Sequence, residues 1–282
     1  MLGGGLAVRF LGVEAPESSL PLPGTMAPRF DLADVRWEQF LTDPFSLDFP
    51  PINPPLDPGL QDYIASRVRP PTALSYVEAA HQASMAFNSM VNRDLFALSI
   101  GYDEFECFIV FAHEVMDRYG RLLGYWHPAQ RDTPREERLL SYNERLLKEG
   151  WVSPYFIWPN INPFRAAPVI TAAVPKPRTA RQLADQDVKL RNARRWVKEA
   201  RDRQIGLYER DTAPGLLPFE LRFLNRRQPP DRWVIDLSQN DHVLIPPQAY
   251  FKVTNPEDRL FVPAEYVPLF VEAGWQRGES SP

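Results

Sequence analysis

Short apolar runs separated by turn residues begin the chain and predict β-strands. The first run, LAVRFLGV at 6–13, is rich in β-forming residues and ends before Pro16, which favours an extended residue ahead of it and stops the strand. Because side chains alternate along a strand, Arg9 would share one face with Leu11 and Val13. Its guanidinium must then leave at a sheet edge or meet an anion.

The pattern becomes helical in the middle of the chain and then returns to strands. Apolar residues recur along one stripe of 75–91 (SYVEAAHQASMAFNSMV), which predicts an amphipathic helix. We expect three strands after it, in LFALSI, FECFIVFAHEV and RLLGYWH, with the DRYGR turn at 117–121 between the last two.

Helical signals return in SYNERLLKEGW. Ser141 has the position of an N-cap, Glu144 completes a capping box, and Gly150 is a C-terminal stop. YFIWPN, from residue 155, is typical of a strand or an extended arm. The stretch 180–203 predicts one long amphipathic helix.

Two regions interrupt this order. Residues 18–75 are dense in proline and show neither helical nor strand periodicity, so we expect an ordered insertion that wraps the surface or a lid. Residues 210–282 hold short apolar runs divided by Pro, Asn and Asp, which predict a small C-terminal extension of unknown role.

Composition indicates a folded, soluble chain, which we expect to be a monomer. Of its 282 residues 44% are hydrophobic, and the net charge of −4 leaves room only for a local positive patch. No window reaches the roughly 18 apolar residues of a membrane span, so we expect no membrane partner. We see no signal peptide in this chain, and the cellular compartment stays open. Secretion is one option if the true N-terminus is missing. The single cysteine, Cys107, excludes an intramolecular disulfide and is interpreted as a small buried residue.

The order of the motifs resembles the staphylococcal nuclease (thermonuclease) family. The strand with VRFLGVEAPE, a helix, the DRYGR hairpin, the YNERLLKEGW helix, YFIWPN and a basic helix closed by GLYE follow one another within 1–17 and about 76–209. The resemblance implies an α+β fold, with an OB-fold β-barrel and helices over 1–209. It also implies hydrolysis of DNA and RNA phosphodiesters with Ca²⁺ as cofactor.

The resemblance also assigns a reaction site, motif by motif. Arg9 and Arg121 match the arginines that contact the scissile phosphate, and Glu17 matches the glutamate that orients or deprotonates the attacking water. Glu14 falls where the family usually has a calcium-binding aspartate, and the backbone carbonyl of Ala15 would be a further ligand.

Substrate contacts follow from the same motifs. Arg118 and Tyr119 occupy positions that hold a neighbouring phosphate in the family, and Tyr155 matches a tyrosine that lines the nucleotide pocket. The family's second pocket tyrosine is replaced here by Ile157.

One more departure concerns the metal. The family's first strand, with its DGDT-type motif and another calcium-binding aspartate, has no counterpart in the sequence. Three explanations stay open: the start is assigned too late, a carboxylate such as Asp31 or Asp34 substitutes, or the protein no longer cuts.

The chemistry of phosphodiester hydrolysis suits these residue types. Negative charge grows on the non-bridging oxygens, so a site needs fixed cations and a base, and an arginine fork donates two parallel hydrogen bonds to a phosphate. Taken alone, however, Arg9 could snorkel from a strand end, the EAPE segment could be an acidic turn, and Arg121 could be a solvated hairpin charge. We therefore expect a calcium-dependent nuclease acting on DNA or RNA. The alternative is a catalytically inactive OB-fold module that binds nucleic acid or a protein.

Overall fold

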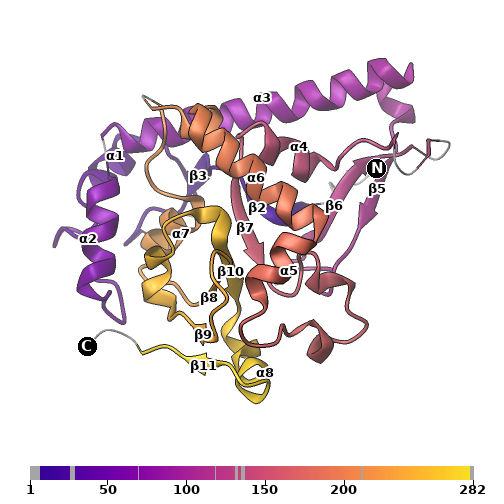
Figure 1. Ribbon diagram of the computed structural model, residues 1–282. Helices are drawn as coiled ribbons and strands as arrows, with labels where there is room; N and C mark the ends of the chain where they lie inside the picture. The colour runs from indigo at the N-terminus through magenta and orange to yellow at the C-terminus, as the bar shows by residue number, and fades with distance from the viewer. Residues whose placement is uncertain are drawn as a thin grey trace.

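The computed structural model describes residues 7–25, 29–68, 70–117, 119–130, 133–134, 137–210 and 212–279. It is a mixed α+β structure in which the long helix α3 runs along one edge (Figure 1). The helices are α1 (Val35–Thr42), α2 (Pro58–Arg67), α3 (Thr72–Leu98), α4 (Tyr142–Lys148), α5 (Ala180–Gln186), α6 (Val188–Arg203), α7 (Pro218–Arg226) and α8 (Val267–Glu272). None of the helices in these ranges has the length and hydropathy needed to cross a membrane.

The strands are short and fall into separate sheets. They are β1 (Val8–Phe10), β2 (Gly12–Glu14), β3 (Ser19–Leu20), β4 (Phe30–Asp31), β5 (Cys107–Val110), β6 (Leu122–Pro128), β7 (Ser153–Ile157), β8 (Trp233–Asp236), β9 (Val243–Leu244), β10 (Arg259–Val262) and β11 (Gln276–Arg277). One sheet has the order β1-β6-β5 and a larger one the order β2-β7-β10-β8, while β3 pairs with β4 and β9 with β11. The α+β class is confirmed, but no closed barrel forms among the described strands.

A corner between β1 and β2 explains why the two main sheets are separate. Gly12 has a φ of +77°, a conformation that residues with a side chain rarely adopt, and it breaks the strand begun by β1. Before the corner β1 runs parallel to β6, and after it β2 runs antiparallel to β7. One continuous segment therefore joins both sheets.

Asn143 of α4 fixes this corner. Its Nδ2 donates to the carbonyls of Leu11, at 2.9 Å, and Gly124, at 3.0 Å, and its Oδ1 accepts from the Trp126 backbone at 3.1 Å. Asn143 is buried, so these bonds satisfy polar groups that water cannot reach.

The larger sheet is buried on both faces. In β7, β10 and β8 neighbouring residues alternate between two hydrophobic clusters: Phe156, Leu260 and Ile235 belong to the first cluster, and Tyr155, Phe261 and Val234 to the second. Residues of α4 and α6 complete the first cluster, and residues of α1, α2 and α7 complete the second. The sheet thus lies between two helical layers.

The described part of the proline-rich segment folds into regular elements. It forms β3, β4, α1 and α2, and it contributes the fully buried Trp37, Phe40 and Leu60 to the second cluster. That residues 18–75 are an insertion stays a prediction, and the buried side chains of α1 and α2 make this segment part of the core.

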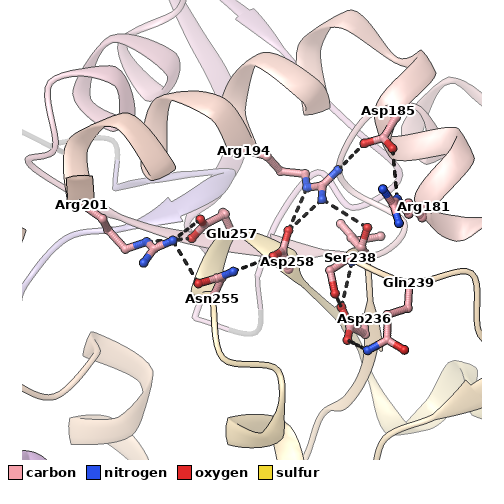
Figure 2. A network of polar contacts seen from close by, with 11 residues as sticks. Arg181, Asp185, Arg194, Arg201, Asp236, Ser238, Gln239, Asn255, Glu257 and Asp258 are labelled. Carbon is pink, nitrogen blue, oxygen red and sulfur yellow. Dashed lines mark hydrogen bonds and ion pairs between the residues drawn. The ribbon is translucent and has the colours of Figure 1, made fainter. Parts of the chain in front are cut away.

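The C-terminal segment, which follows residue 209, packs against elements that precede it in the chain. It supplies β8 and β10 to the larger sheet, and its residues 255–258 are tied to α6 by a polar network (Figure 2). In that network Arg194 binds Asp258, with Nη2 to Oδ1 at 2.7 Å, and Arg201 donates to Glu257, with Nε to Oε2 at 3.1 Å. The domain boundary at 209 stays a prediction.

Three local predictions are wrong. The first four residues of LFALSI are the end of α3 and not a strand, because buried Asp94 accepts hydrogen bonds from Tyr142 and Arg145 of α4 and holds the helix in place. The stretch 180–203 is two helices, since Asp187 leaves the helical conformation and caps α6 by accepting from the Leu190 backbone at 2.8 Å. Cys107 is exposed on β5.

Candidate functional site

A groove of about 1410 Å³ lies between the N-terminal strands, α3 and α7. Its walls come from β1, from the loop after β2, from one side of α3, from the hairpin before β6 and from α7. Five arginines and two glutamates line it: Arg9, Arg29, Arg121, Arg222, Arg226, Glu14 and Glu17. This groove is therefore a positive patch on a chain whose net charge is −4.

Glu14 is the centre of the charged cluster in this groove. It is 4% exposed, and its Oε1 accepts hydrogen bonds from Arg9, at 2.8 Å, and from Arg222. Arg222 also binds Glu17, with 3.3 Å between Nη1 and Oε1. One carboxylate is thus shared by two guanidinium groups, and one of these bridges to the second carboxylate.

The corner at Gly12 produces this arrangement. Arg9 and Glu14 are five positions apart, so a regular strand would point them to opposite faces. Because the chain turns at Gly12, their side chains meet in an ion pair. The face predicted for Arg9, Leu11 and Val13 is interrupted for the same reason.

The hairpin before β6 positions Arg121. Gly120 has a φ of +78° and open space around its Cα, which permits the tight turn. Asp117 accepts from the Tyr119 backbone at 2.9 Å and from Arg121 Nε at 2.7 Å. Burial opposes ionisation of Asp117, but the hydrogen bonds from Arg121 outweigh it and lower the pKa of Asp117. Asp117 therefore stays charged at neutral pH and orients Arg121.

Electrostatics distinguish the two arginines that share Glu14. Burial lowers the pKa of Arg9, against the opposing effect of Glu14. Burial would also lower the pKa of Arg222, but Glu14, Tyr155 and Glu17 raise it above its usual value. Arg222 has two carboxylate partners and a side chain 17% exposed, whereas Arg9 has one partner and is 28% exposed. Arg9 is the guanidinium that can more easily turn to a ligand.

The oxygen ligands available to a cation are few. Within the described ranges, no group of three or more His, Cys, Asp or Glu side chains gathers as a metal site. Asp31 and Asp34 do not line the groove, and Asp34 caps α1 and binds Arg36. However, Oε2 of Glu14 is buried without a partner in the described structure, and Ala15 and Glu17 line the same groove. These hard oxygens suit Ca²⁺, which takes six to eight, so water or a ligand must supply the rest.

The structure brings together most of the residues predicted for the site. Six of them line the groove, namely Arg9, Glu14, Ala15, Glu17, Tyr119 and Arg121. The Tyr119 ring is 62% exposed, and the Arg121 guanidinium lies 5.4 Å from its centre. Arg118 lies outside the described residues.

Tyr155 does not reach the groove. Its side chain is 6% exposed, its ring stacks on Phe219 at 5.5 Å, and Arg232 donates a hydrogen bond to its hydroxyl. These partners come from the C-terminal segment, so the ring offers no free face for stacking on a base.

Sequence reasoning missed the arginines of α7. PFELRFLNR places Arg222 and Arg226 four residues apart on one helix face, and that spacing was the available signal. Nothing in the sequence indicated that this face would pack beside Glu14.

Comparison of the chain with protein-family models, with curated proteins and with solved structures finds no match.

Proposed function

We propose that this chain is a nuclease that hydrolyses phosphodiester bonds of DNA or RNA in the groove. The observation that carries the proposal is that Arg9, Glu17 and Arg121, widely separated in sequence, line one cavity. The resemblance of the sequence motifs to the staphylococcal nuclease family supports the same conclusion. The wide, positively charged groove suits a polyanionic chain.

We also propose that the strands around the groove are an open relative of the OB-fold. β6 is hydrogen-bonded to β5 on one side and to β1 on the other. After the corner at Gly12 the chain that formed β1 continues as β2, which pairs with β7. This continuity supports the assignment, and the C-terminal strands β10 and β8 extend the sheet beyond it.

In the proposed mechanism the phosphate lies between Arg9 and Arg121. Both guanidinium groups would donate to the non-bridging oxygens, on which negative charge grows in the transition state. Arg9 would exchange its bond to Glu14 for one to phosphate, while Arg222 keeps Glu14 neutralised. Glu17 would accept the proton of the attacking water as the water oxygen bonds to phosphorus. The bond between phosphorus and the leaving ester oxygen would break, and solvent water would protonate that oxygen.

Calcium is the proposed cofactor. Glu14, through its unpartnered Oε2, and the Ala15 carbonyl would hold it. A bound Ca²⁺ would supply positive charge that polarises the phosphate and positions water. Calorimetric titration of calcium should show binding that Glu14→Gln abolishes, and this readout does not depend on cleavage.

Replacing Arg121 tests the proposal. Arg121→Ala should lower the cleavage rate of a single-stranded oligonucleotide by about 10²-fold, because one preorganised donor to the transition state is lost. Arg195→Ala is the matched control, since Arg195 lies on α6 with a side chain 59% exposed and does not line the groove. Chelation of calcium should stop cleavage by the wild type. An unchanged rate in Arg121→Ala would remove that residue from the mechanism.

One observation favours a second function: the carboxylates of Glu14 and Glu17 are both already paired with arginines. Glu14 is bound by two arginines, and Glu17 by Arg222 and, at 3.8 Å, by Arg29. This arrangement suits a catalytically silent module that binds a nucleic-acid strand. Tight oligonucleotide binding without turnover, with calcium present, would select this function.

A further inference from the structure

Helix α7, the first helix of the C-terminal segment, forms one wall of the groove. Arg222, Asn225 and Arg226 all line it. Their spacing of three and four residues places them on one face of the helix. A segment to which the sequence assigned no role thus presents a basic helical face to the same cavity as Arg9 and Arg121.

These three side chains differ in whether they already have a bonding partner. Arg222 is bound to Glu14 and Glu17, and Asn225 donates to the carbonyl of Pro21. Arg226 is exposed, and its side chain has no ion pair or hydrogen bond with any residue in the described ranges. Its full positive charge is therefore available to a ligand in the groove.

The ligand chemistry follows from what lines the groove. Arginines outnumber acidic residues, and the exposed ring of Tyr119 lies among them. A positive track with an aromatic platform is the arrangement that binds single-stranded nucleic acids, since the cations follow the phosphates and a ring stacks on a base.

We propose that α7 is an accessory phosphate-binding wall, in which Arg226 binds a phosphate that flanks the one held by Arg9 and Arg121. This inference rests on the proposed function, and it assigns the C-terminal segment to substrate binding. Arg222 is a positioning residue in this arrangement, because it fixes Glu14 and Glu17. The groove consequently selects a strand with more than one phosphate over a mononucleotide.

Binding to oligothymidylates of increasing length tests the proposal. The full chain is titrated into fluorescein-labelled strands that lengthen by one phosphate at a time, with a chelator present so that no strand is cut, and anisotropy reports the affinity. Wild-type affinity should rise in a step when the strand reaches the flanking phosphate. Arg226→Ala should remove that step, with a loss of about three- to tenfold for long strands and no change for the mononucleotide.

Salt dependence and two further variants sharpen the result. For long strands the slope of log affinity against log salt should become shallower by about 0.7 in Arg226→Ala, the effect of one phosphate contact on a single strand. Arg226→Lys should retain most of the step because it keeps the charge, and Arg195→Ala should bind as the wild type does.

The outcomes separate the two proposals. Wild-type binding of long strands with an unchanged length dependence in Arg226→Ala overturns the accessory wall and leaves the proposed function standing. Equal losses for long strands and for the mononucleotide also overturn it, because Arg226 would then bind the central phosphate. A wild type that binds no strand of any length overturns both proposals.

Discussion

Glu14 is a buried carboxylate that two guanidinium groups share. A buried charge is costly unless it is paired, and at 4% exposure Glu14 depends on Arg9 and Arg222 for its compensation. In the proposed mechanism Arg9 leaves this pair for the phosphate. Arg222 must then be the arginine that stays paired with Glu14, beside any bound calcium, and this requirement gives a residue of α7 a role in the stability of the site.

Removal of Arg222 should destabilise the fold. Arg222→Met keeps much of the side-chain volume but leaves Glu14 with one cation, and we expect a loss of about 2–4 kcal/mol in the free energy of unfolding measured with urea. Arg222→Met combined with Glu14→Gln should recover part of the loss, because the unpaired charge is then gone. A loss that is the same in both variants would show that packing, and not charge, is what Arg222 contributes.

Residues of the groove that stand in short local motifs could be predicted from the sequence, whereas those that tertiary packing brings there could not. Arg9, Glu17 and Arg121 stand in recognisable short motifs, and they line one groove. Arg222 stands in an ordinary amphipathic helix, so only the packing of α7 beside Glu14 gives it a role. Tyr155 was misjudged for the converse reason, since Phe219 covers a ring that its motif alone would leave open.

At the scale of elements, the corner between β1 and β2 depends on α4. Asn143 makes three hydrogen bonds to backbone groups, one at Leu11 in the corner and two at Gly124 and Trp126 of β6. Asn143→Ala should leave buried backbone groups without partners and lower the free energy of unfolding by roughly 2–4 kcal/mol. Asn88→Ala, at an exposed position of α3, is the control and should cost little. Equal stability of the two variants would show that water replaces the Asn143 amide.

Secondary-structure elements with strong local sequence signals were predicted. Elements whose conformation depends on tertiary contacts were not. The α4 capping box is confirmed, with the Glu144 backbone donating to Ser141 Oγ at 3.2 Å and the Ser141 backbone donating to Glu144 Oε2 at 2.9 Å. LFALSI has the composition of a strand, yet the contacts of Asp94 with α4 keep its first four residues helical. Propensity is a weak guide wherever a tertiary contact of this kind competes with it.

At the scale of the whole molecule, the C-terminal segment at 210–282, about a quarter of the chain, completes structures that the preceding residues begin. β10 pairs with β7, so the larger sheet requires both parts. The second cluster combines Trp37 and Tyr76 with Leu221, Tyr250 and Phe261. The ion pairs of α6 with Asp258 and Glu257 fasten the same junction (Figure 2).

A fragment that ends at residue 209 should therefore fail to fold. It would expose the edge of β7, uncover the second cluster and leave Glu14 without Arg222, and each of these losses alone is a large fraction of the stability of an ordinary domain. We expect the fragment to lack a cooperative thermal transition by circular dichroism, whereas the full chain shows one. A fragment that unfolds cooperatively would establish 1–209 as an independent domain, and the groove would then have to work with the wall of α7 removed.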